Sequence, residues 1–186
     1  MVTGPSGAGK GTLIQLVLPR FAELALSVSA TTRPQRPGEV EGEHYWFLTR
    51  EEFDAKVEAG EFLEWVDYVG NRYGTLRSEI DRLRAEGKAP LLELETEGAL
   101  RVKRRVDGAV TVFVTAPVDE LERRLRERAT ESSGVIDDRL SKAREQLAEA
   151  ADFDYVVQNR DRNEAAEALI AIIADHLGAP ATMARP

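Results

Sequence analysis

Short apolar runs alternate along this chain with stretches in which apolar residues recur every three or four positions. The short runs predict strands, and the longer period predicts helices. Residues 109–114 (AVTVFV) are the strongest buried-strand signal, and the segment 163–177 places its apolar residues on one helical face. The expected strands are 26–29, 90–95, 109–114 and 155–157, and the expected helices are 10–18, 78–86, 98–105, 118–128, 137–150 and 163–177. This alternation favours a parallel sheet covered by helices on both faces.

Residues 30–76 interrupt the alternation. The segment 44–48 alternates apolar and polar positions, and two further strand-like runs, 62–69 and 72–75, flank Gly70-Asn71, a pair typical of hairpin turns. Most of the aromatic residues fall within this segment. We therefore expect an inserted, small and largely antiparallel β lobe that can close over a ligand.

Two further stretches complete the organisation. A polar insertion at 129–135 contains Ser132-Ser133-Gly134, as a mobile lid does, and residues 178–186 have little periodicity and are expected to fray. The prediction is a single domain over residues 1–186. Its parts are a core of 1–29 and 77–177, the β lobe at 30–76, a lid at about 128–137 and a tail at 178–186.

Composition and charge narrow the class of protein. With 186 residues, of which 42% are hydrophobic, the chain is long enough to bury one core. A formal net charge of −8 argues against broad binding to nucleic acid or to an anionic membrane. The sequence has no cysteine and no run of eighteen apolar residues, so we expect a cytoplasmic protein without a membrane span.

The first expected strand is unusually short. Only Met1, Val2 and Thr3 precede the first glycine, whereas strands usually run for about five or six residues. Because this strand is central in the expected architecture, we expect that the natural chain starts upstream of Met1. The alternative is a sheet that tolerates a short strand.

A glycine-rich segment near the N-terminus carries the most specific chemistry. It consists of Gly4, Pro5, Ser6, Gly7, Ala8, Gly9, Lys10, Gly11 and Thr12. Glycines at this spacing let backbone N–H groups point into a loop, which makes a phosphate site at the N-terminus of the following helix. Lys10 adds a positive charge for the outer phosphates. Gly11 stands where the usual pattern has a hydroxyl that contacts the metal. The segment predicts binding of nucleotide phosphates, and a chance glycine-rich turn is the alternative.

Several separated motifs follow this loop in a characteristic order: 29–39 (SATTRPQRPGE), 42–45 (GEHY), 60–65 (GEFLEW), 70–75 (GNRYGT), 128–131 (RATE) and 138–140 (DRL). From about Val2 to Leu177 the chain resembles guanylate kinases, P-loop nucleoside monophosphate kinases of purine nucleotide metabolism that transfer the γ-phosphoryl group of ATP to GMP. The resemblance implies a P-loop α/β fold with a parallel sheet flanked by helices, an inserted GMP-binding lobe and a lid. It also implies ATP and GMP as partners and Mg²⁺ as the cofactor that ATP carries.

The resemblance assigns four residues to the GMP phosphate: Arg33, Arg36, Tyr45 and Tyr73. Planar guanidinium forks and fixed phenol groups suit a phosphate better than lysine does. The alternatives are solvated loop charge for the two arginines and ordinary packing within a small β lobe for the two tyrosines.

The resemblance assigns guanine selection to Glu64. A carboxylate can accept from both the N1–H and the exocyclic amino group of guanine, and adenine has no donor at N1. Ser29 and Thr75 match positions whose hydroxyls assist base recognition, and Glu93 is counted with the GMP site. A solvated strand carboxylate is the alternative for Glu64.

Catalysis is expected to use Lys10 and Arg33 together with two lid arginines, Arg128 and Arg139. By resemblance, the lid arginines fold onto the phosphate being transferred, where an arginine is worth a factor of about 10³ or more.

Two further residues are expected on the ATP side besides the loop from Gly4 to Thr12. Asn159 follows the last predicted strand, where the family has an Asn beside the adenine. Arg124 lies one helical turn before Arg128 and is expected to approach ATP, with a surface ion pair to Glu120 or Glu127 as the alternative.

The strand end at 93–98 (ELETEG) departs most from the family pattern. Guanylate kinases usually have an acidic residue, an apolar residue and then Asp, and here Glu95 replaces that Asp. The resemblance implies that Glu95 contacts GMP and organises Mg²⁺ through water, which suits a metal that keeps several waters. The extra methylene of Glu95, together with Gly11, leaves slow turnover or weak metal binding open.

Three other functions compete with a guanylate kinase. The first is a kinase for another nucleotide or a phosphorylated ribose on the same scaffold, which Glu64 and the segment 29–36 argue against. The second is a protein-binding module that has lost ATP binding, which the intact loop with Lys10 argues against. The third is a folded but nearly inactive relative, which the Glu95 region suggests.

Overall fold

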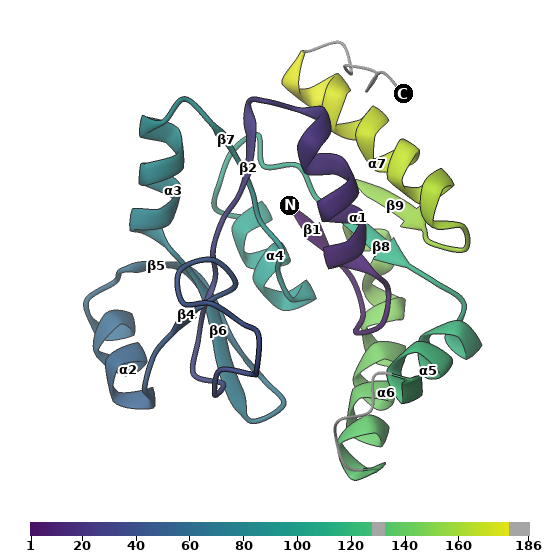
Figure 1. Ribbon diagram of the computed structural model, residues 1–186, viewed down its shortest axis with the longest axis horizontal. Coiled ribbons are helices and arrows are strands. Elements are labelled where there is room, and N and C mark those ends of the chain that lie inside the picture. Colours follow the sequence, from purple (N-terminus) through teal and green to yellow (C-terminus); the bar gives the residue numbers. More distant parts are fainter. Residues whose placement is uncertain (128–132, 179–186) are drawn as a thin grey trace.

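The computed structural model describes residues 1–127 and 133–178, and its central layer is a parallel sheet (Figure 1). The strands of this layer are β1 (Val2–Thr3), β2 (Leu24–Leu26), β7 (Ala89–Leu91), β8 (Val112–Thr115) and β9 (Tyr155–Gln158). β2 pairs with β7, β1 with β8 and β8 with β9, and every pair is parallel. An isolated parallel bridge between Val2 and Glu93 joins the two groups in the order β2-β7-β1-β8-β9. The predicted parallel sheet is confirmed.

Helices cover both faces of this sheet. They are α1 (Lys10–Val17), α3 (Arg77–Ala85), α4 (Thr96–Lys103), α5 (Val118–Glu127), α6 (Ser133–Ala148) and α7 (Arg162–Leu177), with short 3₁₀ turns at Leu18–Arg20 and Glu149–Asp152. In the part of the chain that the structure describes, none of the helices is long and apolar enough to cross a membrane.

The alternation of side chains along β8 explains why both faces are covered. Val112 and Val114 belong to a core cluster beneath α1 and α7, whereas Phe113 belongs to a second cluster with α3 and α4 residues. Successive side chains of a strand point to opposite faces, so a continuous apolar run requires an apolar layer on each side. In Figure 1, α1 and α7 lie side by side over one face.

A second, smaller sheet is inserted between β2 and α3. Its strands are β3 (Ala30–Thr31), β4 (Trp46–Phe47), β5 (Phe62–Tyr68) and β6 (Asn71–Leu76), in the order β4-β3-β6-β5. β6 pairs antiparallel with both β3 and β5, whereas β3 and β4 run parallel. The lobe is therefore largely antiparallel, as predicted, with one parallel pair at its edge.

The hairpin turn of this lobe lies one residue earlier than the sequence predicts. Tyr68 pairs with Asn71, so the two turn residues are Val69 and Gly70, with φ values of 46° and 77°. Positive φ at both central positions is the signature of a type I′ turn, whose twist matches that of the strands it joins. The predicted Gly70-Asn71 turn is wrong because Asn71 already belongs to β6.

The lobe also contains a helix that the sequence analysis did not predict, α2 (Arg50–Glu58). Thr49 and Glu52 form a capping box: the Thr49 side chain accepts from the Glu52 N–H, and the Glu52 carboxylate accepts from the Thr49 N–H. The Thr-x-x-Glu pattern formed by Thr49 and Glu52 is a sequence signal for the start of a helix. The segment has only one buried residue, Phe53, so its apolar periodicity was too weak to indicate a helix.

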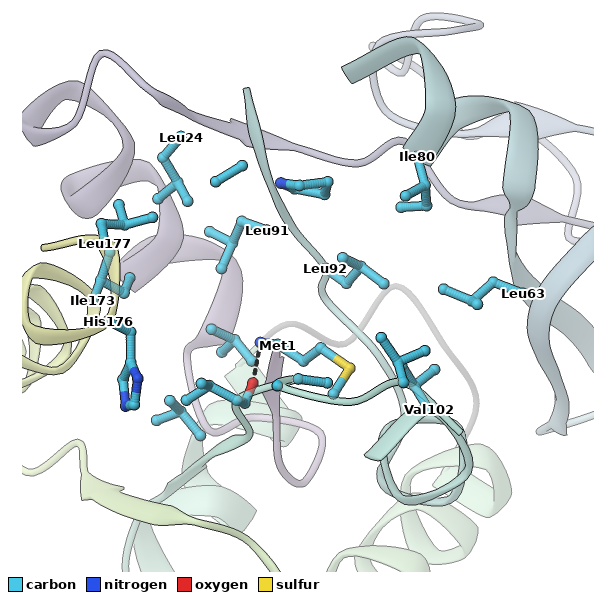
Figure 2. Close-up of a pocket in the computed structure, with 18 of the residues that line it drawn as sticks. Met1, Leu24, Leu63, Ile80, Leu91, Leu92, Val102, Ile173, His176 and Leu177 are labelled. Carbon is cyan, nitrogen blue, oxygen red and sulfur yellow. Dashed lines mark hydrogen bonds between the residues drawn. The ribbon is translucent and has the colours of Figure 1, made fainter. Parts of the chain in front are cut away.

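An apolar cavity of about 470 Å³ lies at the amino end of β1 (Figure 2). Leu24, Leu91, Leu92 and Ile173 are among the aliphatic side chains around it. The Met1 ammonium group donates a hydrogen bond to the Val110 carbonyl there, and burial lowers the pKa of this amine to about 6. None of the predicted site residues that the structure describes lines this cavity.

Candidate active site

A second cavity, of about 340 Å³, lies between the glycine-rich loop, the β lobe and the chain that follows β7. Its lining has more polar than apolar surface, which distinguishes it from the cavity at β1. The predicted site residues that line it are Ser6, Gly7, Gly9, Lys10, Gly11, Thr12, Ser29, Arg33, Arg36, Tyr45, Glu64, Tyr73, Glu93 and Glu95. The fold therefore brings most of the predicted ATP and GMP residues into one cleft.

Glycine is required in the loop by backbone conformation and by space. Gly4, Gly7 and Gly9 all have positive φ, and a Cβ at Gly4 would lie 2.0 Å from the Val114 carbonyl oxygen. A Cβ at Gly9 would lie 2.5 Å from the amide nitrogen of Asn159. The loop is thus pressed against the ends of β8 and β9, and it passes directly into α1, as a phosphate-binding loop does.

The Lys10 ammonium group lies over this loop. Its Nζ donates to the carbonyl oxygens of Gly4 (2.7 Å) and Pro5 (3.3 Å). These contacts fold the long side chain back from α1 across the loop, with its charge at the cleft. The pre-set position suits the outer phosphates of a nucleotide.

Two residues expected to approach ATP contact the backbone of the loop. The Asn159 amide donates to the Ala8 carbonyl (2.7 Å), and Arg124 lies 3.4 Å from the carbonyls of Gly7 and Ala8. Arg124 also pairs with Glu120 at 2.7 Å, so the ion pair weighed as the alternative is present beside the loop contacts. In the described part of the chain, the buried Asn159 Oδ1 has no hydrogen-bond partner, and an acceptor in this state fits a base amino group.

Arg33 and the two tyrosines gather at the lobe side of the cleft. The Arg33 guanidinium lies over the Tyr45 ring, 5.3 Å from its centroid, and the Tyr45 and Tyr73 rings meet edge-to-face at 6.1 Å. The Arg33 side chain is only 11% exposed, which excludes solvated loop charge for this residue. Burial raises the pKa of Tyr45 to about 12, so its hydroxyl keeps its proton and remains a donor at neutral pH.

Glu39 is a site residue that sequence reasoning missed. Its carboxylate accepts from the Arg33 guanidinium (2.7 Å) and from the Arg36 backbone N–H (2.8 Å), and it lines the cleft. Glu39 therefore fixes the conformation of the loop that carries Arg33 and Arg36. The available signal was an acid that follows Gly38, whose positive φ turns the chain back toward Arg36.

Glu64 is a buried carboxylate on β5 that lines the cleft. It is 5% exposed, which excludes the solvated strand carboxylate weighed as the alternative. The Thr75 hydroxyl donates to its Oε1 at 2.9 Å. Burial raises the pKa of Glu64 to about 7, although hydrogen bonds from the Thr75 side chain and backbone oppose the rise.

This pKa predicts a pH dependence of GMP binding. Only the ionised carboxylate accepts from both guanine donors, and its share rises from about a tenth at pH 6 to about nine tenths at pH 8. We expect KM for GMP to fall about tenfold over this range. The phosphate of GMP also titrates near pH 6, so Glu64→Gln is the control, because only the Glu64 contribution is lost in it. An equal pH dependence in both proteins would contradict the assignment.

Two acidic residues face the loop from the chain after β7. The ideal Cβ position of Gly11 is 3.7 Å from a Glu93 carboxylate oxygen, which places Glu93 beside the start of α1. Glu95 accepts from the Gln146 amide on α6 (3.2 Å). Burial raises the pKa of Glu95, and the nearby Lys10 charge opposes this effect.

This donor set fits a metal that arrives with its nucleotide. Among the residues that the structure describes, no group of three or more His, Cys, Asp or Glu side chains is placed to hold a metal ion. Mg²⁺ usually keeps several waters and takes one or two carboxylates together with substrate phosphates. Glu93 and Glu95 can supply these one or two carboxylates.

The structure describes only part of the predicted lid. Arg128 lies outside the described residues, and Arg139 belongs to α6 but its side chain lies outside what is described. α6 begins at Ser133, four residues before the predicted helix start, so the predicted lid residues 133–137 are helical.

Comparison with known proteins identifies the family of this chain. The family profile described as guanylate kinase matches residues 1–176. The chain belongs to the guanylate kinase family. Within it, the guanylate kinase of Synechococcus elongatus is 48% identical over 93% of this chain and 95% of its own length, and that of Rubrobacter xylanophilus is 47% identical over 93% and 91%. The crystal structure of guanylate kinase from Anaplasma phagocytophilum has a TM-score of 0.74 at 30% identity, covering 94% of this chain and 82% of that chain.

Family membership confirms the predicted fold class and the predicted enzyme class. The parallel sheet, its flanking helices and the inserted lobe are the P-loop kinase fold. The enzyme class is nucleoside monophosphate kinase, a nucleotide-binding transferase.

Proposed function

We propose that this guanylate kinase family member transfers the γ-phosphoryl group of ATP to GMP within the cleft between the glycine-rich loop and the β lobe. One observation carries the proposal: a buried carboxylate, Glu64, shares a single cleft with a phosphate loop and its lysine. A carboxylate at one end suits guanine, and the loop at the other end suits a triphosphate.

The loop side supplies positioning and charge neutralisation for ATP. Phosphoryl transfer needs little covalent help from a protein, since most of the catalysis comes from aligning the reacting oxygens and stabilising their charge. Lys10 lines the cleft with its ammonium group over the loop, which supports a role for this residue and the loop N–H groups at the outer phosphates. The Oδ1 of Asn159, which is unpartnered among the described residues, supports a role for this side chain as an acceptor toward adenine.

The lobe side holds GMP. Arg33, Arg36, Tyr45 and Tyr73 line the cleft at the lobe and bind the phosphate. The Arg33–Glu39 ion pair and the edge-to-face contact of the two tyrosines hold these donors before substrate arrives, so little ordering cost remains for binding. Glu64 accepts from guanine, with the Thr75 hydroxyl supporting its orientation.

Glu93 and Glu95 would hold the waters of the Mg²⁺ that ATP carries, and Gln146 fixes the Glu95 carboxylate from α6. When bound, this Mg²⁺ would supply charge neutralisation at the ATP phosphates. We expect Glu95→Gln to raise the Mg²⁺ concentration that gives half-maximal rate by about 10- to 100-fold. Glu95→Asp retains the charge and is expected to stay close to the unsubstituted protein. Equal Mg²⁺ titrations for Glu95→Gln and the unsubstituted protein would remove Glu95 from this role.

Calorimetric titration of the protein with GMP and with AMP tests the guanine site without any chemical step. We expect GMP to bind at least tenfold more tightly than AMP at pH 8. Equal affinities would overturn the placement of guanine beside Glu64.

A further inference from the structure

Gly98, on the first turn of α4, is a glycine that its backbone does not require. Ten other glycines have positive φ values, and Gly98 is not among them. Gly98 is buried within the regular helix α4. Glycine is among the least favourable residues in a helix because it loses the most backbone entropy. A reason other than conformation must therefore account for it.

That reason is space for the Glu64 carboxylate. A Cβ built on Gly98 would lie 2.4 Å from Glu64 Oε2 and 3.2 Å from its carboxyl carbon. Contacts under 3.0 Å force something to shift, and here the atom that can shift is the end of the Glu64 side chain. The carboxylate thus rests directly on the backbone of α4, and its other oxygen, Oε1, receives the Thr75 hydroxyl at 2.9 Å.

The helix side of this contact is tied to the lobe, so the carboxylate at the end of the Glu64 side chain is the part that moves. The Arg101 guanidinium on α4 donates to the Trp65 carbonyl on β5 at 2.7 Å, which ties the helix to the strand that carries Glu64. The side chain of Val66 lies 3.7 Å from the same Cβ position. A methyl group at position 98 would consequently displace the carboxylate and leave the helix where it is.

We propose that Gly98 is a positioning residue for guanine recognition. Because Gly98 has no side chain, the Glu64 carboxylate can pack against the backbone of the first turn of α4 and face the cleft. This inference rests on the proposed function of Glu64. Gly98 does not touch the substrate in this arrangement and acts only through Glu64.

The test compares Gly98→Ala with the unsubstituted protein in steady-state kinetics at pH 8. We expect KM for GMP to rise at least tenfold and KM for ATP to change less than twofold, with a smaller preference for GMP over AMP. A substitution that merely loosened the fold would not separate the two substrates in this way. Unchanged KM for GMP, or an equal rise for both substrates, would overturn the proposal.

A double substitution separates positioning from general damage. In a Glu64→Ala background the added methyl group has no carboxylate to meet, so Gly98→Ala should raise the Tm there, as alanine does in a helix. It should also leave kcat/KM for GMP unchanged there, whereas with Glu64 present the same change should lower both quantities. Equal effects in both backgrounds would overturn the proposal.

Glu64→Gln, measured beside these variants, separates the role of Gly98 from the proposed function of Glu64. Impaired GMP kinetics in Glu64→Gln with normal kinetics in Gly98→Ala would overturn the role of Gly98 alone. Normal GMP kinetics in Glu64→Gln would overturn the proposed function of Glu64 and this inference with it.

Discussion

Replacing Lys10 by alanine is expected to lower kcat/KM for ATP by about 10²–10³-fold, the cost of losing one pre-positioned charge at the reacting phosphates. The ammonium group is already held over the loop by the Gly4 and Pro5 carbonyls, so it needs little rearrangement when the nucleotide binds. Initial rates at varied Mg·ATP and saturating GMP measure the effect.

The control for Lys10→Ala is Lys56→Ala. Lys56 pairs with Glu61 on the surface of the lobe and does not line the cleft, so we expect its loss to change the kinetics less than twofold. Thermal unfolding of Lys10→Ala is measured as well, because Lys10 also bonds to the loop. A Lys10→Ala protein that folds normally and turns over at the unsubstituted rate would contradict the assignment of the loop.

Replacing Glu64 by glutamine is expected to lower kcat/KM for GMP by about 30- to 150-fold, which corresponds to about 2–3 kcal/mol. The amide nitrogen of glutamine would face a guanine donor, so one hydrogen bond is lost and a buried donor is left unsatisfied. The kinetics are measured at pH 8, where the carboxyl group, with a pKa of about 7, is mostly ionised. KM for ATP should stay within twofold of its original value.

Glu61→Gln is the matched control for this second variant, since Glu61 immediately precedes β5 but is exposed and lies outside the cleft. Its GMP kinetics should be unchanged. Equal GMP kinetics for Glu64→Gln and Glu61→Gln would mean that guanine is read elsewhere.

Most elements of the core were predictable because their patterns are local, but β2 (Leu24–Leu26) overlaps the predicted strand 26–29 at one residue and β7 (Ala89–Leu91) ends four residues before the predicted end at 95. The run through Phe113 required an apolar layer on both faces, and the 163–177 periodicity placed α7 within one residue of its observed start. The Asp161 side chain accepts from the backbone N–H groups of Asn163 and Glu164, a cap that the sequence signals directly. Elements of this kind are decided by residues close together in the chain.

The errors occur at features that no hydrophobic period reveals. The hairpin register depends on which residue of β5 faces Asn71, and the positive φ values of Val69 and Gly70 fix that pairing through the type of turn. Glu39 and Gly98 escaped notice for the same reason: their roles consist of contacts with Arg33 and Glu64, which no local period reveals. Gly98 lies 34 positions from Glu64 along the chain.

The most direct test of the central claim is ADP formation from Mg·ATP with GMP, AMP, CMP or UMP offered separately to the purified protein. We expect rapid turnover with GMP and rates at least about a hundredfold lower with each of the other acceptors, on the scale of discrimination that a buried hydrogen-bonding site gives. Turnover with another acceptor at a rate equal to that with GMP would contradict the guanine assignment, and absence of turnover with GMP would contradict the account as a whole.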